Sequence, residues 1–340
     1  MAWQEMYDTA SAIVADNKGI LAADESSGTI KKRFDSIGAE STEETRRFYR
    51  NLLFTTPGME DFIGGVILYD ETIRQASDDG TPFAELLASK GVVPGIKVDT
   101  GAYDLAGHPG EKVTEGLDGL RGRLAEYVEL GARFAKWRAV ITIGEGIPTD
   151  PCIDANAHPL ARYAALCQEA GLVPIVEPEV LMDGDNTIET CEEVTGRTLR
   201  AVYGALYEHD VHLRGTLLKP NMVIAGKGCP DQASAERIAE LTVHTLLRHV
   251  PALVPGIVFL SGGQSELEAT ENLYAINKIG GPWPLSFSYG RALQASALKA
   301  WAGEARNAEA AQAAFAQRAR MNSLAVAGEW SAEMEQPVTA

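Results

Sequence analysis

The segments VPIVEP (173–178) and GTLLKP (215–220), with the long stretch 188–210 between them, decide the fold. Short β-branched and apolar runs of this kind indicate buried strands, and the intervening stretch has helical periodicity. A strand, a helix and a second strand in this order predict parallel pairing through a right-handed crossover.

The same unit recurs along the whole chain. Six further apolar runs are GILAA (19–23), GGVILY (64–69), VPGIKV (93–98), FAKWRAVI (134–141), GIVFLS (256–261) and LSFSY (285–289). Other predicted helices cover 42–54, 160–170, 231–250 and 266–278, the first with Ser41 and Glu44 in capping-box spacing. Eight strand–helix units predict an α/β protein with a closed (β/α)8 barrel. An open doubly wound sheet is the alternative, but no GxGxxG follows the first strand.

No linker or low-complexity insert divides the 340 residues. We therefore expect a single domain over 1–340, with a barrel at about 19–303 and a C-terminal helix and tail at 304–340. The first 17 residues lack an apolar signal core and predict an amphipathic terminal helix instead of an export signal.

Composition narrows the possible partners. Lys and Arg number 30 and Asp and Glu 47, so the net charge of −17 would repel nucleic acid and anionic membranes. No apolar run approaches the roughly 20 residues that span a bilayer. Four scattered cysteines without CxxC pairing favour reduced thiols in a cytoplasmic setting. An anionic substrate would need a basic pocket within this acidic surface.

Polar side chains gather where the predicted strands end, which is the face on which barrels carry their active sites. Alternation along a strand places Lys136 and Arg138 on one side, and likewise Glu177 and Glu179. Such converging charges can compensate one another and bind a charged ligand. The strand-end residues are Asp24, Glu25, Ser26, Lys97, Asp99, Lys136, Arg138, Glu177, Glu179, Lys219, Ser261, Gly262, Gly263, Ser288, Gly290 and Arg291.

Lys219 ends an apolar run and precedes a proline. A nucleophilic lysine must be neutral, although its free pKa is about 10.4. Partial burial and nearby cations, for which Lys97 and Lys136 are candidates, both disfavour the ammonium form. The competing interpretation is a lysine that extends from a strand end into solvent.

Two loops are suited to phosphate. SGGQSELEA (261–269) has Ser261, Gly262 and Gly263 before a helix, and SYGRALQ (288–294) has Ser288, Gly290 and Arg291. Loops after the seventh and eighth strands are the usual phosphate site of a barrel. Either loop alone is equally consistent with an ordinary turn into a helix.

A second anion candidate lies after the first strand, where Ser26 and Thr29 precede Arg33. An N-capped helix explains the same residues. The six histidines show no cluster with carboxylates or cysteines, so we expect no metal site and no cofactor.

The segments GILAADES, GIKVD, FAKWR, IVEPE, TLLKPNM, FLSGGQSE and SYGRALQASALKAW resemble those of class I fructose-bisphosphate aldolases, in the same order from Gly19 to Leu324. The resemblance implies a TIM barrel and reversible cleavage of fructose 1,6-bisphosphate to dihydroxyacetone phosphate and glyceraldehyde 3-phosphate, as in glycolysis. It also implies a homotetramer with small sugar phosphates as ligands.

By the same resemblance, Lys219 forms the Schiff base, Asp24 assists C–C cleavage and Lys136 binds the reacting hydroxyl. Glu177 acts as acid and base with Glu179 beside it. The ketone-side phosphate corresponds to Ser261, Gly262 and Arg291, and the aldehyde-side phosphate to Arg33, Lys97, Ser26 and Thr29.

One departure concerns the C-terminus. Animal-type relatives end in a tyrosine that assists proton exchange at C3, whereas this chain ends EQPVTA and its last tyrosine is Tyr289. The group that protonates C3 and the preference for the bisphosphate over fructose 1-phosphate are therefore open. Two other functions stay open at this point: a different Schiff-base aldolase, and a catalytically idle barrel that binds a partner protein.

Overall fold

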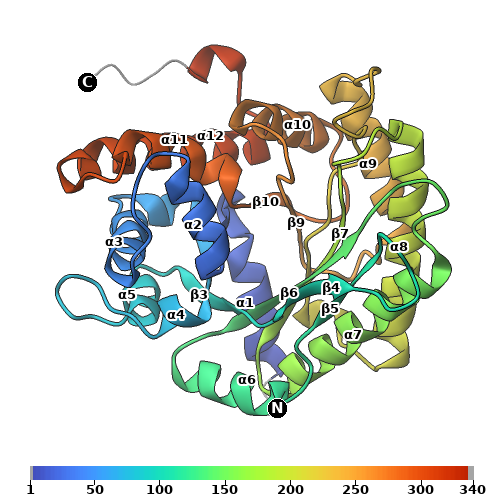
Figure 1. Ribbon diagram of the computed structural model, residues 1–340, viewed down its shortest axis with the longest axis horizontal. Coiled ribbons are helices and arrows are strands. Elements are labelled where there is room, and N and C mark those ends of the chain that lie inside the picture. Colours follow the sequence, from blue (N-terminus) through green and yellow to red (C-terminus); the bar gives the residue numbers. More distant parts are fainter. Residues whose placement is uncertain (1–2, 336–340) are drawn as a thin grey trace.

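Eight parallel strands form a closed barrel in the computed structural model, which describes residues 3–335 (Figure 1). This confirms the predicted architecture. Around the barrel the strands follow the order β1-β10-β9-β8-β7-β6-β3-β2, so the first strand pairs with the last. The strands are β1 (Gly19–Ala23), β2 (Ile63–Leu68), β3 (Val93–Lys97), β6 (Phe134–Ile141), β7 (Val173–Val180), β8 (Leu217–Leu218), β9 (Ile257–Phe259) and β10 (Leu285–Tyr289).

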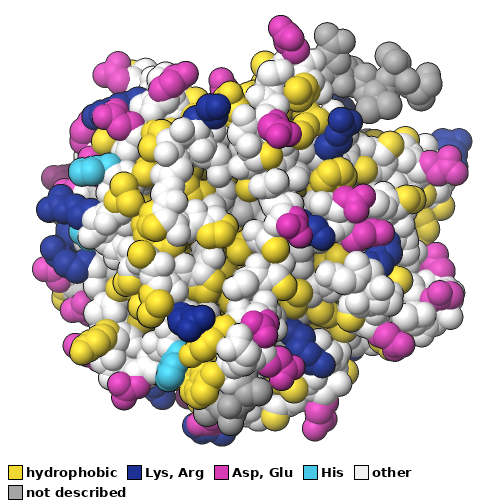
Figure 2. Space-filling model, turned by 180° about the vertical axis from the view of Figure 1, so that it is seen from behind, with side chains coloured by type: hydrophobic (Ala, Val, Ile, Leu, Met, Phe, Trp, Pro, Cys, Tyr) yellow, Lys and Arg dark blue, Asp and Glu magenta, His cyan; other side chains and the backbone are white. Residues whose placement is uncertain are grey.

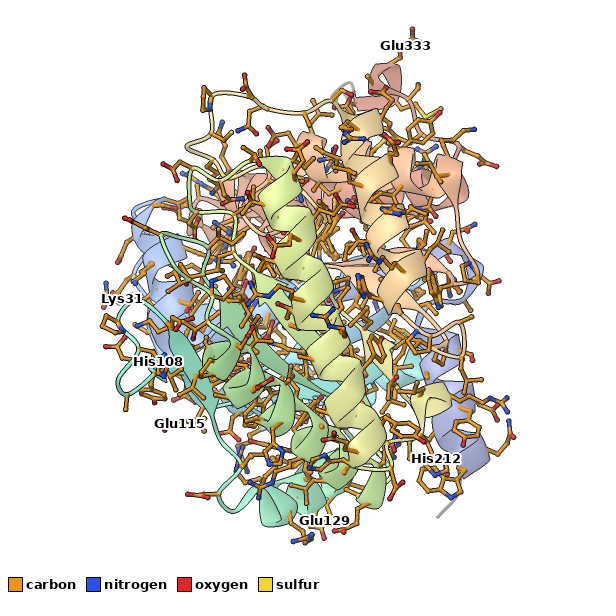
Figure 3. The ribbon with its side chains drawn as sticks, turned by 90° about the vertical axis from the view of Figure 1, so that its right-hand side faces the viewer. Lys31, His108, Glu115, Glu129, His212 and Glu333 are labelled. Atoms are coloured by element: carbon orange, nitrogen blue, oxygen red, sulfur yellow. The ribbon has the colours of Figure 1, made fainter. Side chains whose placement is uncertain are left out.

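Helices surround the barrel, with α10, α11 and α12 together on one side (Figure 1). The long helices α8 and α9 pack against each other and cross the face shown in Figure 3. The helices are α1 (Trp3–Ile13), α2 (Ser27–Asp35), α3 (Glu43–Phe54), α4 (Asp70–Ile73), α5 (Phe83–Ser89), α6 (Leu120–Glu129), α7 (Asp150–Glu169), α8 (Ile188–Glu208), α9 (Ala235–His249), α10 (Glu266–Ile279), α11 (Arg291–Trp301) and α12 (Ala308–Ala327). Among the described residues, no helix is both long and apolar enough to cross a membrane.

Expectations for two helices were wrong, and strand β8 is shorter than the predicted run 215–220. Helix α7 begins at Asp150, ten residues before the predicted start, because Thr149 caps it and Pro159 is accommodated inside it. The capping box of α3 is formed by Thr42 and Thr45, not by Ser41 and Glu44. A short antiparallel hairpin that the sequence did not suggest, β4 (Gly101–Asp104) with β5 (Lys112–Glu115), follows β3.

The core has two parts. The larger one lies between the barrel and its helices, and the smaller one fills the barrel interior. Helix α1 closes the lower end of the barrel, because Met6, Ala10 and Ile13 pack with the interior cluster. Phe134 belongs to that cluster, and the two-residue period of a strand places Lys136 and Arg138 above it on the same interior side of β6.

The register of the strands then brings charges together at the upper end. Lys97 lies beside Lys136 across the β3–β6 pair, and Arg138 lies beside Glu177 across the β6–β7 pair. On the rear face of the molecule, acidic and basic side chains are interspersed with apolar ones (Figure 2). The converging charges at the strand ends define where the site is built.

Candidate active site

A cavity of about 510 Å³ opens at the carboxyl ends of the strands. The structure brings the predicted strand-end residues together there, with two exceptions, Asp99 and Gly263, which do not line the cavity. The lining contains Asp24, Ser26, Thr29, Arg33, Lys97, Lys136, Arg138, Glu177, Glu179, Lys219, Ser261, Gly262, Ser288, Gly290 and Arg291, together with Ala22, Glu25, Lys32, Ser36 and Leu260.

Lys219 is only 4% exposed, so it does not extend into solvent. It follows directly after β8, and its backbone N–H donates to the carbonyl of Val176 at 2.8 Å, which fixes its position at the barrel rim. Its Nζ lies 3.0 Å from Glu177 Oε1. Lys136, one of the two candidate nearby cations, contacts the other oxygen of the same carboxylate, with its Nζ 3.3 Å from Glu177 Oε2.

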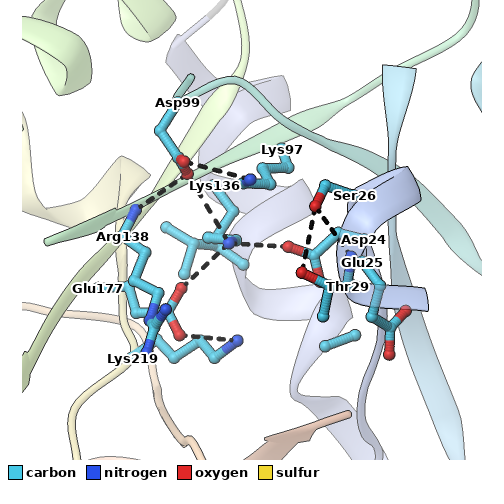
Figure 4. Close-up of polar contacts among 12 residues, drawn as sticks. Asp24, Glu25, Ser26, Thr29, Lys97, Asp99, Lys136, Arg138, Glu177 and Lys219 are labelled. Atoms are coloured by element: carbon cyan, nitrogen blue, oxygen red, sulfur yellow. Dashed lines mark hydrogen bonds and ion pairs between the residues drawn. The ribbon is translucent and has the colours of Figure 1, made fainter. Parts of the chain in front are cut away.

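Lys136 stands at the centre of the ion network (Figure 4). Its Nζ lies 2.8 Å from Asp24, 3.3 Å from Glu177 and 3.9 Å from Asp99. Burial alone would lower the pKa of Lys136, but the three carboxylates raise it above its usual value, so the side chain is a cation.

Asp24 and Glu177 are ionised because nearby cations lower their pKa values. Burial would raise the pKa of Asp24, but Lys136 and Lys219 lower it well below its usual value. Burial also acts to raise the pKa of Glu177, and the charges of Lys219, Lys136 and Arg138 lower it. Both groups can therefore accept a proton when a substrate or lysine supplies one.

Arg138 pairs with Glu179 on the same side of the cavity. Glu179 is 6% exposed, whereas the arginine side chain is 43% exposed and reaches toward the opening. Lys136 and Arg138 were predicted to point to the same side of their strand, and Glu177 and Glu179 likewise. The Arg138–Glu179 and Lys136–Glu177 contacts confirm this.

The loop after β9 offers fewer groups to an anion than expected. Ser265 and Glu268 form a capping box at the start of α10, so the helix terminus is already satisfied. The N–H of Gly263 donates to Met182 Sδ at 2.8 Å, and Gly263 does not line the cavity. Ser261 and Gly262 remain, and Gly262 has a φ of +56°, which favours glycine.

The loop after β10 is open to an anion. Helix α11 begins at Arg291 after Gly290 and has no side-chain cap, so its first N–H groups are free to bind an anion. Arg291 donates to the carbonyl of Gly262 and thereby joins the two loops. Ser288 Oγ is buried and has no hydrogen-bond partner among the described residues, and Ser288 lines the cavity. The two loops together form one wall of the cavity, with groups suited to binding an anion.

The residues after β1 that were interpreted either as an anion site or as a helix cap serve as the cap and also line the cavity. Ser26 caps α2 by accepting a hydrogen bond from the N–H of Thr29, yet both residues also line the cavity. Arg33 Nη1 lies 2.6 Å from Glu25 Oε1. Sequence reasoning missed Lys32 and Ser36, which also line the cavity. The available signal was their position: Lys32 precedes Arg33 on α2, and Ser36, the C-cap of that helix, lies about one turn after Lys32.

Sequence reasoning also missed Arg50. It reaches Glu25 from α3, with Nη2 2.6 Å from Oε2, and is 3% exposed. No local pattern could have identified this pairing, because it depends on how α3 packs. Tyr289, the last tyrosine, is buried and donates to the carbonyl of Ala269, so it does not face the cavity. The terminal segment 336–340 lies outside the described residues.

No group of three or more His, Cys, Asp or Glu that could hold a metal ion occurs within residues 3–335. The arrangement offers a buried lysine beside an ionised carboxylate, a second lysine–carboxylate pair 2.8 Å apart, and loops whose groups are suited to anions. A barrel with such a site defines a class of enzyme, the Schiff-base aldolases that act on phosphorylated sugars.

Comparison with known proteins specifies the family. The family model "Fructose-bisphosphate aldolase class-I" matches residues 5–340. A probable fructose-bisphosphate aldolase class 1 of Xanthomonas campestris is 61% identical over 332 residues, covering 97% of this chain and 99% of the relative. A fructose-bisphosphate aldolase of Echinococcus multilocularis is 55% identical over 335 residues, covering 98% and 92%.

Solved structures agree. The fructose-bisphosphate aldolase of Plasmodium falciparum, solved in complex with TRAP and a small-molecule inhibitor, superimposes with a TM-score of 0.95 at 52% identity and covers 96% of this chain and 95% of that one. The chain belongs to the class I fructose-bisphosphate aldolase family. It is a carbon–carbon lyase that reversibly cleaves fructose 1,6-bisphosphate to dihydroxyacetone phosphate and glyceraldehyde 3-phosphate through a lysine Schiff base.

Proposed function

We propose that Lys219 is the lysine that forms the Schiff base and that Glu177 is its acid and base. Proton transfer across the 3.0 Å between Lys219 Nζ and Glu177 Oε1 yields a neutral amine and a neutral acid. The amine then attacks C2 of the ketose, and the protonated Glu177 supplies the proton with which the carbinolamine hydroxyl leaves as water. This single contact carries the proposal.

Asp24 and Lys136 act on the next bond. Asp24 accepts the proton of the C4 hydroxyl, and the electrons of the C3–C4 bond move into the iminium to give a neutral enamine and an aldehyde. Lys136, 2.8 Å from Asp24, stabilises the negative charge that develops on the C4 oxygen. Glu179 supports the site indirectly by pairing with Arg138.

The two anion-binding walls set the orientation of the substrate. Ser261, Gly262, Ser288, Gly290 and Arg291 bind the ketone-side phosphate, and Gly263 supports that loop through its bond to Met182. On the opposite wall the aldehyde-side phosphate binds Arg33, Lys97, Arg138, Ser26 and Thr29. Fixing both ends places C2 at the lysine, which contributes to rate through orientation.

Borohydride reduction in the presence of dihydroxyacetone phosphate, followed by peptide mass mapping, tests the proposal. The reduced adduct is expected on Lys219 and is expected to be absent in Lys219→Ala. Lys31→Ala is the matched control, because Lys31 is an exposed lysine paired with Asp35 on the surface of α2. An adduct on another lysine of the wild-type protein would refute the assignment.

The state and location of the protein are part of the same proposal. We propose a cytoplasmic homotetramer in which residues 1–340 form one domain. The cysteines Cys152, Cys167, Cys191 and Cys229 are all free and buried, which suits a reducing compartment. Tyr207 on α8 and Leu247 on α9 are 85% and 57% exposed and offer apolar surface for a subunit contact. Light scattering coupled to size-exclusion chromatography measures the subunit number.

A further inference from the structure

Asp99 is a buried carboxylate with no role in the chemistry described above. It follows β3 by two residues, and its side chain is 3% exposed. Its Oδ1 lies 3.3 Å from Lys97 Nζ, and its Oδ2 lies 3.9 Å from Lys136 Nζ (Figure 4). The backbone N–H of Arg138 donates to the same Oδ2 at 3.4 Å. Asp99 therefore contacts three basic residues of the site, Lys97, Lys136 and Arg138.

The cavity does not include Asp99 in its lining, although Lys97, Lys136 and Arg138 all line it. The carboxylate thus lies behind the basic residues, on the side away from the substrate. Gly116, directly after β5, packs against the backbone of Asp99: a Cβ at Gly116, whose φ is +128°, would lie 3.3 Å from Asp99 Cα and 2.9 Å from the N–H nitrogen of Thr100. Only a residue without a side chain permits this close approach to the backbone of Asp99, whose side chain is 3% exposed.

The hairpin is attached to the same strand end. Thr114 Oγ1 donates to the carbonyl of Arg138 at 2.8 Å, so the hairpin and Asp99 hold the two polar backbone groups of one residue. His108 and Glu115 of this hairpin region lie at the same edge of the molecule as Lys31 of α2 (Figure 3). The hydrogen bonds of Thr114 and Asp99 to the backbone of Arg138 therefore hold the hairpin and the carboxylate at the same strand end.

The charge of Lys136 must survive the whole reaction. Two of its three carboxylate partners change protonation in turn in the proposed mechanism: Glu177 holds the proton of Lys219 until the carbinolamine loses water, and Asp24 then takes the proton of the C4 hydroxyl. Lys136 is 3% exposed, and a buried ammonium without a counter-charge loses its proton. Asp99 is the remaining carboxylate within 4 Å, and it touches no reacting atom.

We propose that Asp99 is a positioning residue that keeps Lys136 charged and in place while Asp24 carries the substrate proton, and that directs Lys97 into the cavity. The inference rests on the roles proposed above for Lys219, Glu177 and Asp24. It separates two stages of the reaction. Asp99 is needed when the C3–C4 bond breaks, whereas imine formation with dihydroxyacetone phosphate depends on Lys219 and Glu177 and has no C4 hydroxyl to deprotonate.

Asp99→Asn tests the proposal, because it removes the charge and keeps the shape. Cleavage of fructose 1,6-bisphosphate is expected to lose about 10- to 100-fold in kcat, the range typical of groups that orient a ligand from behind. Borohydride trapping of dihydroxyacetone phosphate on Lys219 is expected to stay within about twofold of wild type. The alkaline limb of the kcat profile is expected at lower pH, because Lys136 loses one of the carboxylates that raise its pKa.

The matched control is Asp104→Asn. Asp104 lies on β4 and also pairs with a lysine, Lys112, but its side chain is 86% exposed and far less of its charge is shielded from water. Its kcat and pH profile are expected to equal those of wild type. Asp99→Glu retains the charge and is expected to recover part of the lost kcat, which a purely structural role would not explain.

Wild-type kcat in a folded Asp99→Asn variant would overturn the proposal, as would an equal loss of cleavage and trapping. If Asp99→Asn does not fold, Asp99→Glu decides: an unchanged ratio of cleavage to trapping overturns the inference, and a lowered ratio supports it. Failure of the wild-type protein to form an adduct on Lys219 would instead refute the proposed function itself, so the two failures are distinguishable.

Discussion

Glu25 is the carboxylate whose loss we expect to cost the most stability near the site. It joins four elements, because it follows β1 and contacts Arg33 of α2 and Arg50 of α3, both at 2.6 Å, and Gln294 of α11 at 3.2 Å. Burial would raise the pKa of Glu25, but Arg50 and Arg33 lower it, so the group is ionised. Glu25→Gln keeps the size of the side chain and removes its charge.

The expected cost follows from what remains buried. Arg50 is 3% exposed and Nη1 already has no partner among the described residues, so it would be left as an uncompensated cation. Breaking a buried ion pair from one side costs about 3–5 kcal/mol. Arg33 is 21% exposed in its side chain and adds little, because water compensates it. At about 2.1 cal/mol/K of unfolding entropy per residue, this lowers Tm by about 4–7 °C.

Differential scanning calorimetry measures the change, with Asp35→Asn as the matched control. Asp35 pairs with Lys31 on the same helix as Arg33, but the two side chains are 54% and 60% exposed, so the control is expected to change stability by less than about 1 kcal/mol. Glu25→Gln is also expected to raise KM, because Arg33 loses its anchor beside the cavity. Equal Tm values for the two variants would refute this reasoning.

Three further outcomes are expected. The folded-state pKa values of Asp24, Glu25 and Glu177 are lowered, so their contribution to stability is complete at neutral pH and is lost as the pH falls below about 4; calorimetry between pH 3 and 7 measures it. Gly64→Ala is expected to destabilise by about 2–3 kcal/mol in thermal melts, because its Cβ would overlap the carbonyl oxygen of Ile13, whereas Gly28→Ala meets no atom within 4 Å and serves as control. Incubation with EDTA is expected to leave cleavage unchanged, and a chelator-sensitive rate would contradict the lysine mechanism.

The strands were predictable because each is a short apolar run, and the charged exceptions within them identified the site. Lys136 and Glu177 interrupt β6 and β7 at interior positions, where an isolated charge would be too costly to bury. The gathering of charged side chains in one cavity could therefore be predicted from the sequence once the strands were taken to be parallel. The strand β8 was predicted too long, because Pro220 has no N–H to continue the ladder beyond Lys219.

Features that depend on packing between distant segments could not be predicted. The pairing of Arg50 with Glu25 joins two elements through the placement of α3, and the contact between Gly263 and Met182 depends on a loop 81 residues earlier. The β4–β5 hairpin was missed because most of β4 is exposed and shows no alternation of apolar side chains. Its hydrogen bond from Thr114 to the backbone of Arg138 joins residues 24 positions apart and could not be read from either segment alone.

The pairing of β1 with β10 has a consequence for how the chain is made. Ile20 and Leu21 leave the ribosome long before their partners Ser288 and Tyr289, which follow them by 268 residues in the chain. At about 5–20 residues per second, the growing sheet keeps an unpaired edge for many seconds, and such an edge invites association with other chains. Nascent chains of this protein are therefore expected to need protection by chaperones until the last strand is released.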